Sequence, residues 1–206
     1  MKHEILSSLA QLIGKEKYEV HIVNEIINFK NLCISVVARD GRGRTHHARN
    51  LDYLNSEILK KLIYQENVYK NGSIAAKLIG FGGITGAYTG LSAKGFSISY
   101  NTRGTIGKRK IKDNVDKLLD ERYRSTQDVI YDALVGSNSV GEAIEFISNT
   151  KMTAPGFFII SSNQSGPNKG SPDTIITKDR DGIVNVKQLD RESEWFMIST
   201  NRDFQD

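Results

Sequence analysis

The apolar positions of the chain follow a helical period near its start and a strand period after residue 33. Apolar residues recur every three to four positions over 5–13, which predicts an amphipathic helix. Residues 18–29 show a similar pattern and also favour a helix, although their β-branched residues leave a strand open. Beyond this point, short β-branched runs alternate with turn signals, and these predict antiparallel strands.

Two hairpins are predicted in the first half of the chain. The first spans 33–50 with its turn at Asp40–Gly43, and the second spans 59–78 with its turn at Asn71-Gly72, the strongest short turn signal in the sequence. The other expected elements are helices over 125–134 and 140–147, N-capped by Ser125 or Thr126 and by Ser139, and strands over 95–100, 156–161, 173–177, 183–186 and 195–200.

This order of elements predicts the α+β class. Runs of strands are separated by a run of helices, whereas a parallel doubly wound sheet would alternate strands with helices. Two antiparallel sheets with helices on their outer faces satisfy the order. The length of 206 residues suits one domain with a sizeable core.

Charge and hydropathy narrow the range of partners. The formal net charge is +4, and no apolar run reaches the ~20 residues of a membrane span. Nucleic acid is disfavoured as a partner because no aromatic residues interleave the densest basic run. A solvated loop is favoured there, with an anionic lipid surface as the alternative. That run consists of Arg103, Lys108, Arg109, Lys110 and Lys112.

The single cysteine lies at the start of the first hairpin. One cysteine excludes an internal disulfide, and such a residue is most often a buried hydrophobe. A turn centred near Gly41 would place Cys33 opposite residue 49, give or take one, and so put Arg49 beside the thiol. A fixed positive charge favours the reactive thiolate. Asp52 is expected just past the strand end, on the same side. The competing interpretation is a surface ion pair of Arg49 with Asp52.

The sequence around these residues closely resembles the family of acid ceramidase and N-acylethanolamine-hydrolyzing acid amidase. Its segments CISVVARD, from Cys33, and HARNLDY, from His47, are similar to the family patterns C-T-S-I-V-A-x-D and H-G-R-N-[LM]-D-[YF]. The resemblance covers roughly residues 18–206. Further similar segments are Ala154–Ile160, Asn163–Gly166, Ile176–Arg180, Trp195-Phe196 and Thr200-Asn201.

The resemblance implies an N-terminal-nucleophile hydrolase with an αββα sandwich. Members of the family cut themselves before the cysteine, so the expected scissile bond is Leu32–Cys33. Residues 1–32 would form a helical propeptide-like α segment, and 33–206 a partial catalytic β segment that stays associated with it. The new terminal cysteine supplies both the thiol and the α-amine that serves as base.

The resemblance also assigns roles to individual residues. Cys33 attacks the amide carbonyl, and Arg49 holds the thiolate or the substrate carbonyl by charge-assisted hydrogen bonds. Asp52 accepts from the α-amine and orients it. Asn201 donates to the developing oxyanion. Asn101 is either a second oxyanion donor or a turn former at a strand end.

The expected reaction is hydrolysis of a lipid amide, either ceramide or an N-acylethanolamine, to a fatty acid and an amine. Bile-salt and penicillin amides are the alternative substrates. No cofactor is implied. A metal site is disfavoured because the adjacent His46 and His47 point to opposite faces of a strand. The family implies a lysosomal or secretory location, although the start of the chain does not resemble a signal peptide.

Two departures support a second hypothesis. Thr102 stands where the family usually carries an acidic residue, and the chain stops at Asp206, before the D-D-R-R-T block of the family. The segment before Cys33 is also shorter than the resemblance implies, so we expect a chain truncated at both ends, with a degenerate gene product as the alternative. The alternative function is a non-catalytic remnant that serves as a lipid-binding or partner-binding module.

Overall fold

The computed structural model describes residues 11, 32–52, 56–103, 116–117, 119–164 and 166–203. The helices expected over 5–13 and 18–29, the α segment 1–32 and most of the basic run lie outside the described residues, apart from isolated positions at their edges. The description below therefore concerns the two predicted hairpins and the second half of the chain.

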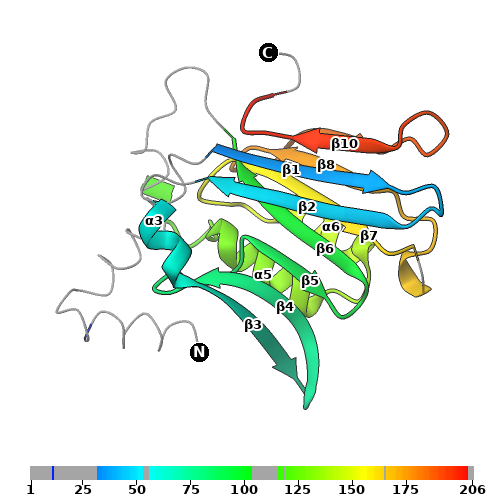
Figure 1. The fold of residues 1–206 in the computed structure, drawn as a ribbon. Helices are drawn as coiled ribbons and strands as arrows, with labels where there is room; N and C mark the ends of the chain where they lie inside the picture. The colour runs from blue at the N-terminus through cyan, green and yellow to red at the C-terminus, as the bar shows by residue number, and fades with distance from the viewer. Residues whose placement is uncertain are drawn as a thin grey trace.

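The first described strands belong to a three-stranded antiparallel sheet (Figure 1). Its order is β10-β1-β2, with bounds Phe196–Ser199 for β10, Leu32–Arg39 for β1 and Thr45–Asp52 for β2. The predicted hairpin of 33–50 is thus confirmed, and β1 becomes the central strand because β10, the last of the described strands, pairs with it.

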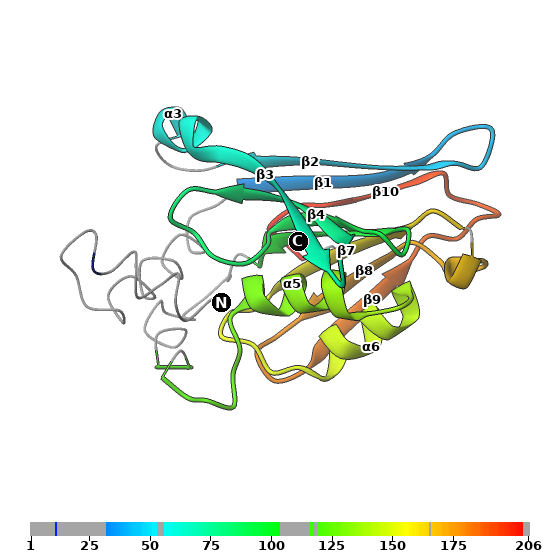
Figure 2. The same cartoon turned by 90° about the horizontal axis from the view of Figure 1, so that it is seen from below.

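A seven-stranded antiparallel sheet lies beneath the first one, as Figure 2 shows. Asn71 and Gly72 both adopt positive φ values, of 52° and 76°, as a tight hairpin turn of the predicted kind requires. The short strand β5 was not predicted, because its segment TGLS has little β-branched character. In sheet order the strands are β3 Ile63–Lys70, β4 Ser73–Phe81, β5 Thr89–Ser92, β6 Phe96–Thr102, β7 Gly156–Ser162, β8 Thr174–Lys178 and β9 Ile183–Gln188.

The helices α5, Thr126–Gly136, and α6, Val140–Asn149, cover the outer face of the larger sheet (Figure 2). Their predicted N-caps are confirmed: the side chains of Ser125 and Ser139 accept from the third backbone N–H that follows each of them. The segment expected to begin the second hairpin instead forms α3, Ser56–Leu59, and the 3-10 turn η2, Lys60–Leu62. A further 3-10 turn, η3, spans Gly166–Asn168.

Strand β7 lies at the centre of the hydrophobic core. All seven of its residues are buried, because one face meets the helices and the other meets the smaller sheet. Phe158 packs in the cluster with the helices, whereas Phe157 packs between the sheets with Val37 and Met197. This explains why the segment reads as a continuous apolar run and not as an alternating one.

The predicted α+β class and the two facing sheets are confirmed. The fold is the expected αββα sandwich, of which the described residues supply both sheets and the helical layer on the larger one. The two sheets are also joined by a partly buried ion pair, in which Arg39 on β1 donates to Asp173, just before β8, at 2.9 Å. Among the described residues, no helix is long and apolar enough to cross a membrane.

Candidate functional site

Cys33 is the second residue of β1 and lies between the two sheets, with 2% of its surface exposed. It pairs with Leu51, so the prediction that it lies opposite residue 49, give or take one, is wrong. The loop is centred on Arg42 because the Asp40 carboxylate accepts from the backbone N–H groups of Arg42 and Arg44. The actual register is displaced by two residues, which preserves the face of each side chain.

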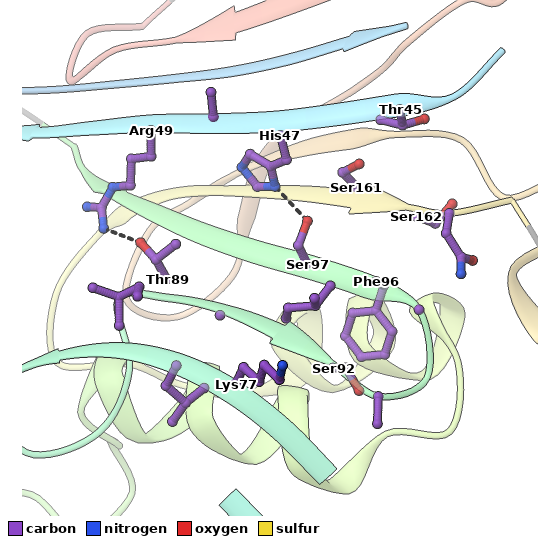
Figure 3. A pocket seen from close by; sticks show the side chains of 18 of the residues that line it. Thr45, His47, Arg49, Lys77, Thr89, Ser92, Phe96, Ser97, Ser161 and Ser162 are labelled. Atoms are coloured by element: carbon purple, nitrogen blue, oxygen red, sulfur yellow. Dashed lines mark hydrogen bonds between the residues drawn. The ribbon is translucent and has the colours of Figure 1, made fainter. Parts of the chain in front are cut away.

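Arg49 therefore still lies on the same face as Cys33. Its Nη2 atom is 3.6 Å from the sulfur and also donates to the carbonyl of Tyr100. Nη1 donates to the carbonyl of Tyr88 at 3.2 Å and to Thr89 Oγ1 at 2.7 Å (Figure 3). The larger sheet thus holds the guanidinium in place next to the thiol. The predicted pairing of a positive charge with Cys33 is present in the structure.

Asn201 follows β10 and contacts the nitrogen of Cys33. Its Oδ1 accepts from the backbone N–H of Cys33, and its Nδ2 donates to the carbonyl of Thr102 at 2.6 Å and to Thr102 Oγ1 at 3.0 Å. The N–H of Cys33 can only donate and the carbonyl of Thr102 can only accept. These two partners therefore fix which end of the Asn201 amide is the oxygen and which is the nitrogen. The predicted amide donor to an oxyanion is engaged with Thr102 in this arrangement.

Asn101 is fully buried within β6 and points between the sheets. Its Nδ2 donates to the carbonyl of Ser199 at 3.0 Å, and its Oδ1 accepts from Ser35 Oγ at 3.0 Å. It is not a turn former, since β6 continues through Thr102. Its amide holds β10 to the larger sheet beside the Cys33 position.

Asp52 does not lie beside the thiol. It is the last residue of β2 instead of lying past the strand end, and it pairs with Leu32 across the ladder. Its side chain is exposed, and strand alternation places it on the face opposite to Cys33. The predicted contact between Asp52 and the site is therefore absent from the described arrangement, although its backbone adjoins the Leu32–Cys33 bond.

Two cavities flank Arg49. One has a volume of about 650 Å³ and opens between β2 and strands β4 to β6, with Ile79, Leu91 and Phe96 among its apolar lining residues (Figure 3). The other, of about 400 Å³, has Leu51 and Phe81 in its lining. The guanidinium thus stands where a polar group of a ligand could meet it while an apolar part fills a cavity. Within the described ranges, no group of three or more His, Cys, Asp or Glu residues is arranged to hold a metal.

Proteins of named activity are similar to this chain in sequence and in fold. The N-acylethanolamine-hydrolyzing acid amidase of Oryctolagus cuniculus is 31% identical over 183 residues, which make up 88% of this chain and 49% of the relative. The acid ceramidase of Homo sapiens is 28% identical over 207 residues, covering 88% of this chain and 50% of the relative. A solved Caenorhabditis elegans N-acylethanolamine-hydrolyzing acid amidase ortholog has a TM-score of 0.68 at 28% identity, covering 84% of this chain and 71% of that chain.

The chain is a homologue of acid ceramidase and N-acylethanolamine-hydrolyzing acid amidase. The resemblance inferred from the motifs at Cys33 and Arg49 is thereby confirmed. No protein-family model matches the chain. The chain spans about half the length of the curated relatives that it matches.

One polar residue beside the site was missed in the sequence. The motifs assigned His47 no role beyond the disfavoured metal site, yet its Nδ1 lies 2.7 Å from Ser97 Oγ and its Nε2 lies 2.8 Å from Ser99 Oγ. The prediction that His46 and His47 point to opposite faces is confirmed, since His46 is exposed and His47 is half-buried. The signal that could have found it is the spacing of two from Arg49, which puts both side chains on one face.

Burial of His47 predicts a loss of stability in acid. Burial, together with the charge of Arg49, lowers the pKa of His47 from 6.5 to about 4. Between these values the unfolded chain binds the proton and the folded chain does not, so stability falls as the pH drops from 6.5 towards 4 and levels off below that. The loss is about 3 kcal/mol. The free energy of unfolding, measured in urea across this pH range, should depend less steeply on pH for His47→Gln than for the unmodified chain. Parallel curves would contradict the prediction.

Proposed function

We propose that the chain is a cysteine amidohydrolase of lipid amides, with ceramide or an N-acylethanolamine as substrate. The observation that carries this proposal is the pair of contacts at Cys33: a guanidinium 3.6 Å from the sulfur and the Asn201 side-chain carbonyl on the nitrogen. The sulfur and the nitrogen of the expected N-terminal nucleophile thus each contact a different polar side chain, Arg49 and Asn201. Homology to two amidohydrolases supports the same chemistry.

The first step in this proposal is cleavage of the chain at Leu32–Cys33. The sulfur of Cys33 attacks the carbonyl carbon of Leu32, the peptide C–N bond breaks, and the proton that the thiol loses ends on the freed nitrogen. Water then hydrolyses the resulting thioester, which leaves a carboxylate on Leu32 and a free thiol and amine on Cys33. Segments 1–32 and 33–206 remain associated.

The same thiol then acts on the substrate. The α-amine of Cys33 takes the thiol proton, the sulfur attacks the amide carbon, and the protonated amine product leaves. Water hydrolyses the acyl thioester to the free fatty acid and regenerates the thiol. Because the base and nucleophile belong to one residue, the reaction needs no separate histidine to remove the proton and no cofactor.

The surrounding residues divide the remaining tasks. Arg49 holds the thiolate and, in the reaction, the carbonyl oxygen of the substrate. Asn201 keeps its Oδ1 on the nitrogen of Cys33 after cleavage and so orients the amine. Asn101 fixes the backbone beside Asn201. Asp52 pairs with Leu32 through the backbone, and its exposed side chain on the opposite face has no part in these steps.

The cavities beside Arg49 suit the apolar acyl chain of a lipid amide, and Arg49 suits its polar amide group. Their linings are mainly apolar, which suits an acyl chain, and Arg49 lies in the lining of both. Bile-salt and penicillin amides present a bulkier ring system and are the alternative substrates. The word "acid" in the names of the relatives supports an acidic compartment, of the lysosomal or secretory route, as the place of action.

The proposal is tested on the unmodified chain at about pH 5. Intact-mass analysis should give two pieces divided between residues 32 and 33. The processed protein should release fatty acid from an N-acylethanolamine or a ceramide, and comparison of the two rates identifies the substrate. A chain that stays in one piece and releases nothing from either lipid would refute the proposal and favour a non-catalytic lipid-binding or partner-binding module.

A further inference from the structure

A continuous line of buried hydrogen bonds runs between the sheets from His47 towards Cys33. His47 Nε2 lies 2.8 Å from Ser99 Oγ, which donates to Ser35 Oγ at 3.0 Å. Ser35 Oγ in turn donates to Asn101 Oδ1 at 3.0 Å. Ser35, Ser99 and Asn101 have no exposed surface, so solvent cannot replace a lost partner and each bond is costly to break.

The far end of this line sets the direction of every bond in it. Asn101 Oδ1 can only accept, so Ser35 donates its one hydroxyl hydrogen there. Ser35 must then accept from Ser99, whose own hydrogen is used in that bond. Ser99 can therefore only accept from His47, and the imidazole carries its hydrogen on Nε2. Nδ1 is left as the acceptor for Ser97 Oγ at 2.7 Å, the contact drawn in Figure 3.

The charged groups around His47 agree with a neutral ring. Burial and the positive charge of Arg49, two residues along β2, disfavour the imidazolium, and the negative charge of Asp173 opposes them. The partners supplied by β6, Ser97 and Ser99, are neutral hydroxyls. The ring is thus a single donor toward Ser99 with a fixed tautomer.

The other end of the line reaches the backbone that carries Asn201. Asn101 Nδ2 donates to the carbonyl of Ser199 at 3.0 Å and lies 3.5 Å from the carbonyl of Thr200. The next residue, Asn201, accepts from the nitrogen of Cys33. A change in the orientation of the Asn101 side chain is therefore transmitted through two carbonyl groups to the residue that contacts the nucleophile.

We propose that His47 is a positioning residue, which through this line of hydrogen bonds holds Asn201 against the nitrogen of Cys33. The inference rests on the proposed function. His47 does not touch the reacting atoms, and its contribution is one N–H that keeps the serine hydroxyls pointing toward Asn101. A substituted side chain that also donates to Ser99 should therefore preserve the function of His47, and an apolar side chain of similar size should not.

Variants on the line test the proposal by rescue and by non-additivity. His47→Leu should slow both the cleavage at Leu32–Cys33 and kcat by roughly 10- to 100-fold. His47→Gln, whose amide can donate to Ser99, should stay within about threefold of the unmodified chain. Ser99→Ala should reproduce the loss of His47→Leu, and the double variant should be no slower than either alone, because both break the same line. The matched control is His46→Leu, the exposed neighbour on the opposite face, which should change neither rate.

Two kinetic results would overturn the inference while leaving the proposed function intact. One is a His47→Leu chain that is cleaved and turns over like the His46→Leu control. The other is a double variant whose loss is the product of the two single losses, since that would show two independent effects.

Nuclear magnetic resonance separates failure of the inference from failure of the proposed function. In a chain labelled with ¹⁵N at histidine and asparagine, His47 should show the Nε2–H tautomer at neutral pH, and Ser99→Ala should shift the side-chain amide signals of Asn201. These signals are read whether or not the chain hydrolyses anything. An Nδ1–H tautomer, or Asn201 signals unmoved by Ser99→Ala, would refute the line itself.

Discussion

Replacing Cys33 with alanine should stop both the cleavage of the chain and the release of fatty acid. The change removes the only cysteine, and with it the sulfur that both steps require, while the small side chain still fits between the sheets. Loss of a nucleophile lowers turnover on the order of a million-fold. Intact mass should show one uncut chain, and chromatography of the lipid products should show no fatty acid above the uncatalysed background.

A control on the same face of β1 separates chemistry from packing. Val37 is fully buried between the sheets, and Val37→Ala should lower the free energy of unfolding by about 2 kcal/mol through lost apolar contact. It should nevertheless leave cleavage and turnover of the folded protein near those of the unmodified chain. Hydrolysis that survives in Cys33→Ala would mean that another residue is the nucleophile.

Replacing Arg49 with methionine should lower kcat by about a thousandfold, which corresponds to about 4 kcal/mol of transition-state stabilisation. Methionine has a similar reach but cannot hold a thiolate or a carbonyl oxygen. Arg49→Lys keeps the charge but loses the planar guanidinium that contacts Thr89 and the sulfur together. Its kcat should therefore lie between that of Arg49→Met and that of the unmodified chain. The measurement is fatty-acid release by the folded fraction, with urea unfolding as the check on that fraction.

Arg44 provides the matched control for this experiment. It lies in the turn of the same hairpin, with 64% of its side chain exposed in an ion pair with Asp40. Arg44→Met removes an arginine of the same type at a distance from the thiol and should leave kcat unchanged, because an exposed pair of this kind contributes little. If Arg49→Met and Arg44→Met had the same kcat, the guanidinium beside Cys33 would have no part in the reaction.

The sequence by itself determined the features that depend on neighbouring residues. The turn at Asn71-Gly72 was predictable because both positions need a positive φ, and the helix starts at Ser125 and Ser139 because a hydroxyl there satisfies a free N–H. The strand pattern that begins at Cys33 is likewise a local property. The motifs also placed Arg49 on the face of Cys33, since a register displaced by two residues leaves that face unchanged.

Only the tertiary structure decided which distant side chains meet at the thiol. Asn201 lies 168 residues from Cys33 and reaches it because β10 pairs with β1, a long-range contact that no local pattern contains. Strand β5 forms from a weak segment because its neighbours β4 and β6 supply hydrogen bonds on both sides. The exposed position of Asp52 and the hydrogen-bonded line from His47 depend in the same way on register and on the stacking of two sheets. Those follow from the burial of both inner faces together, which is a property of the whole chain.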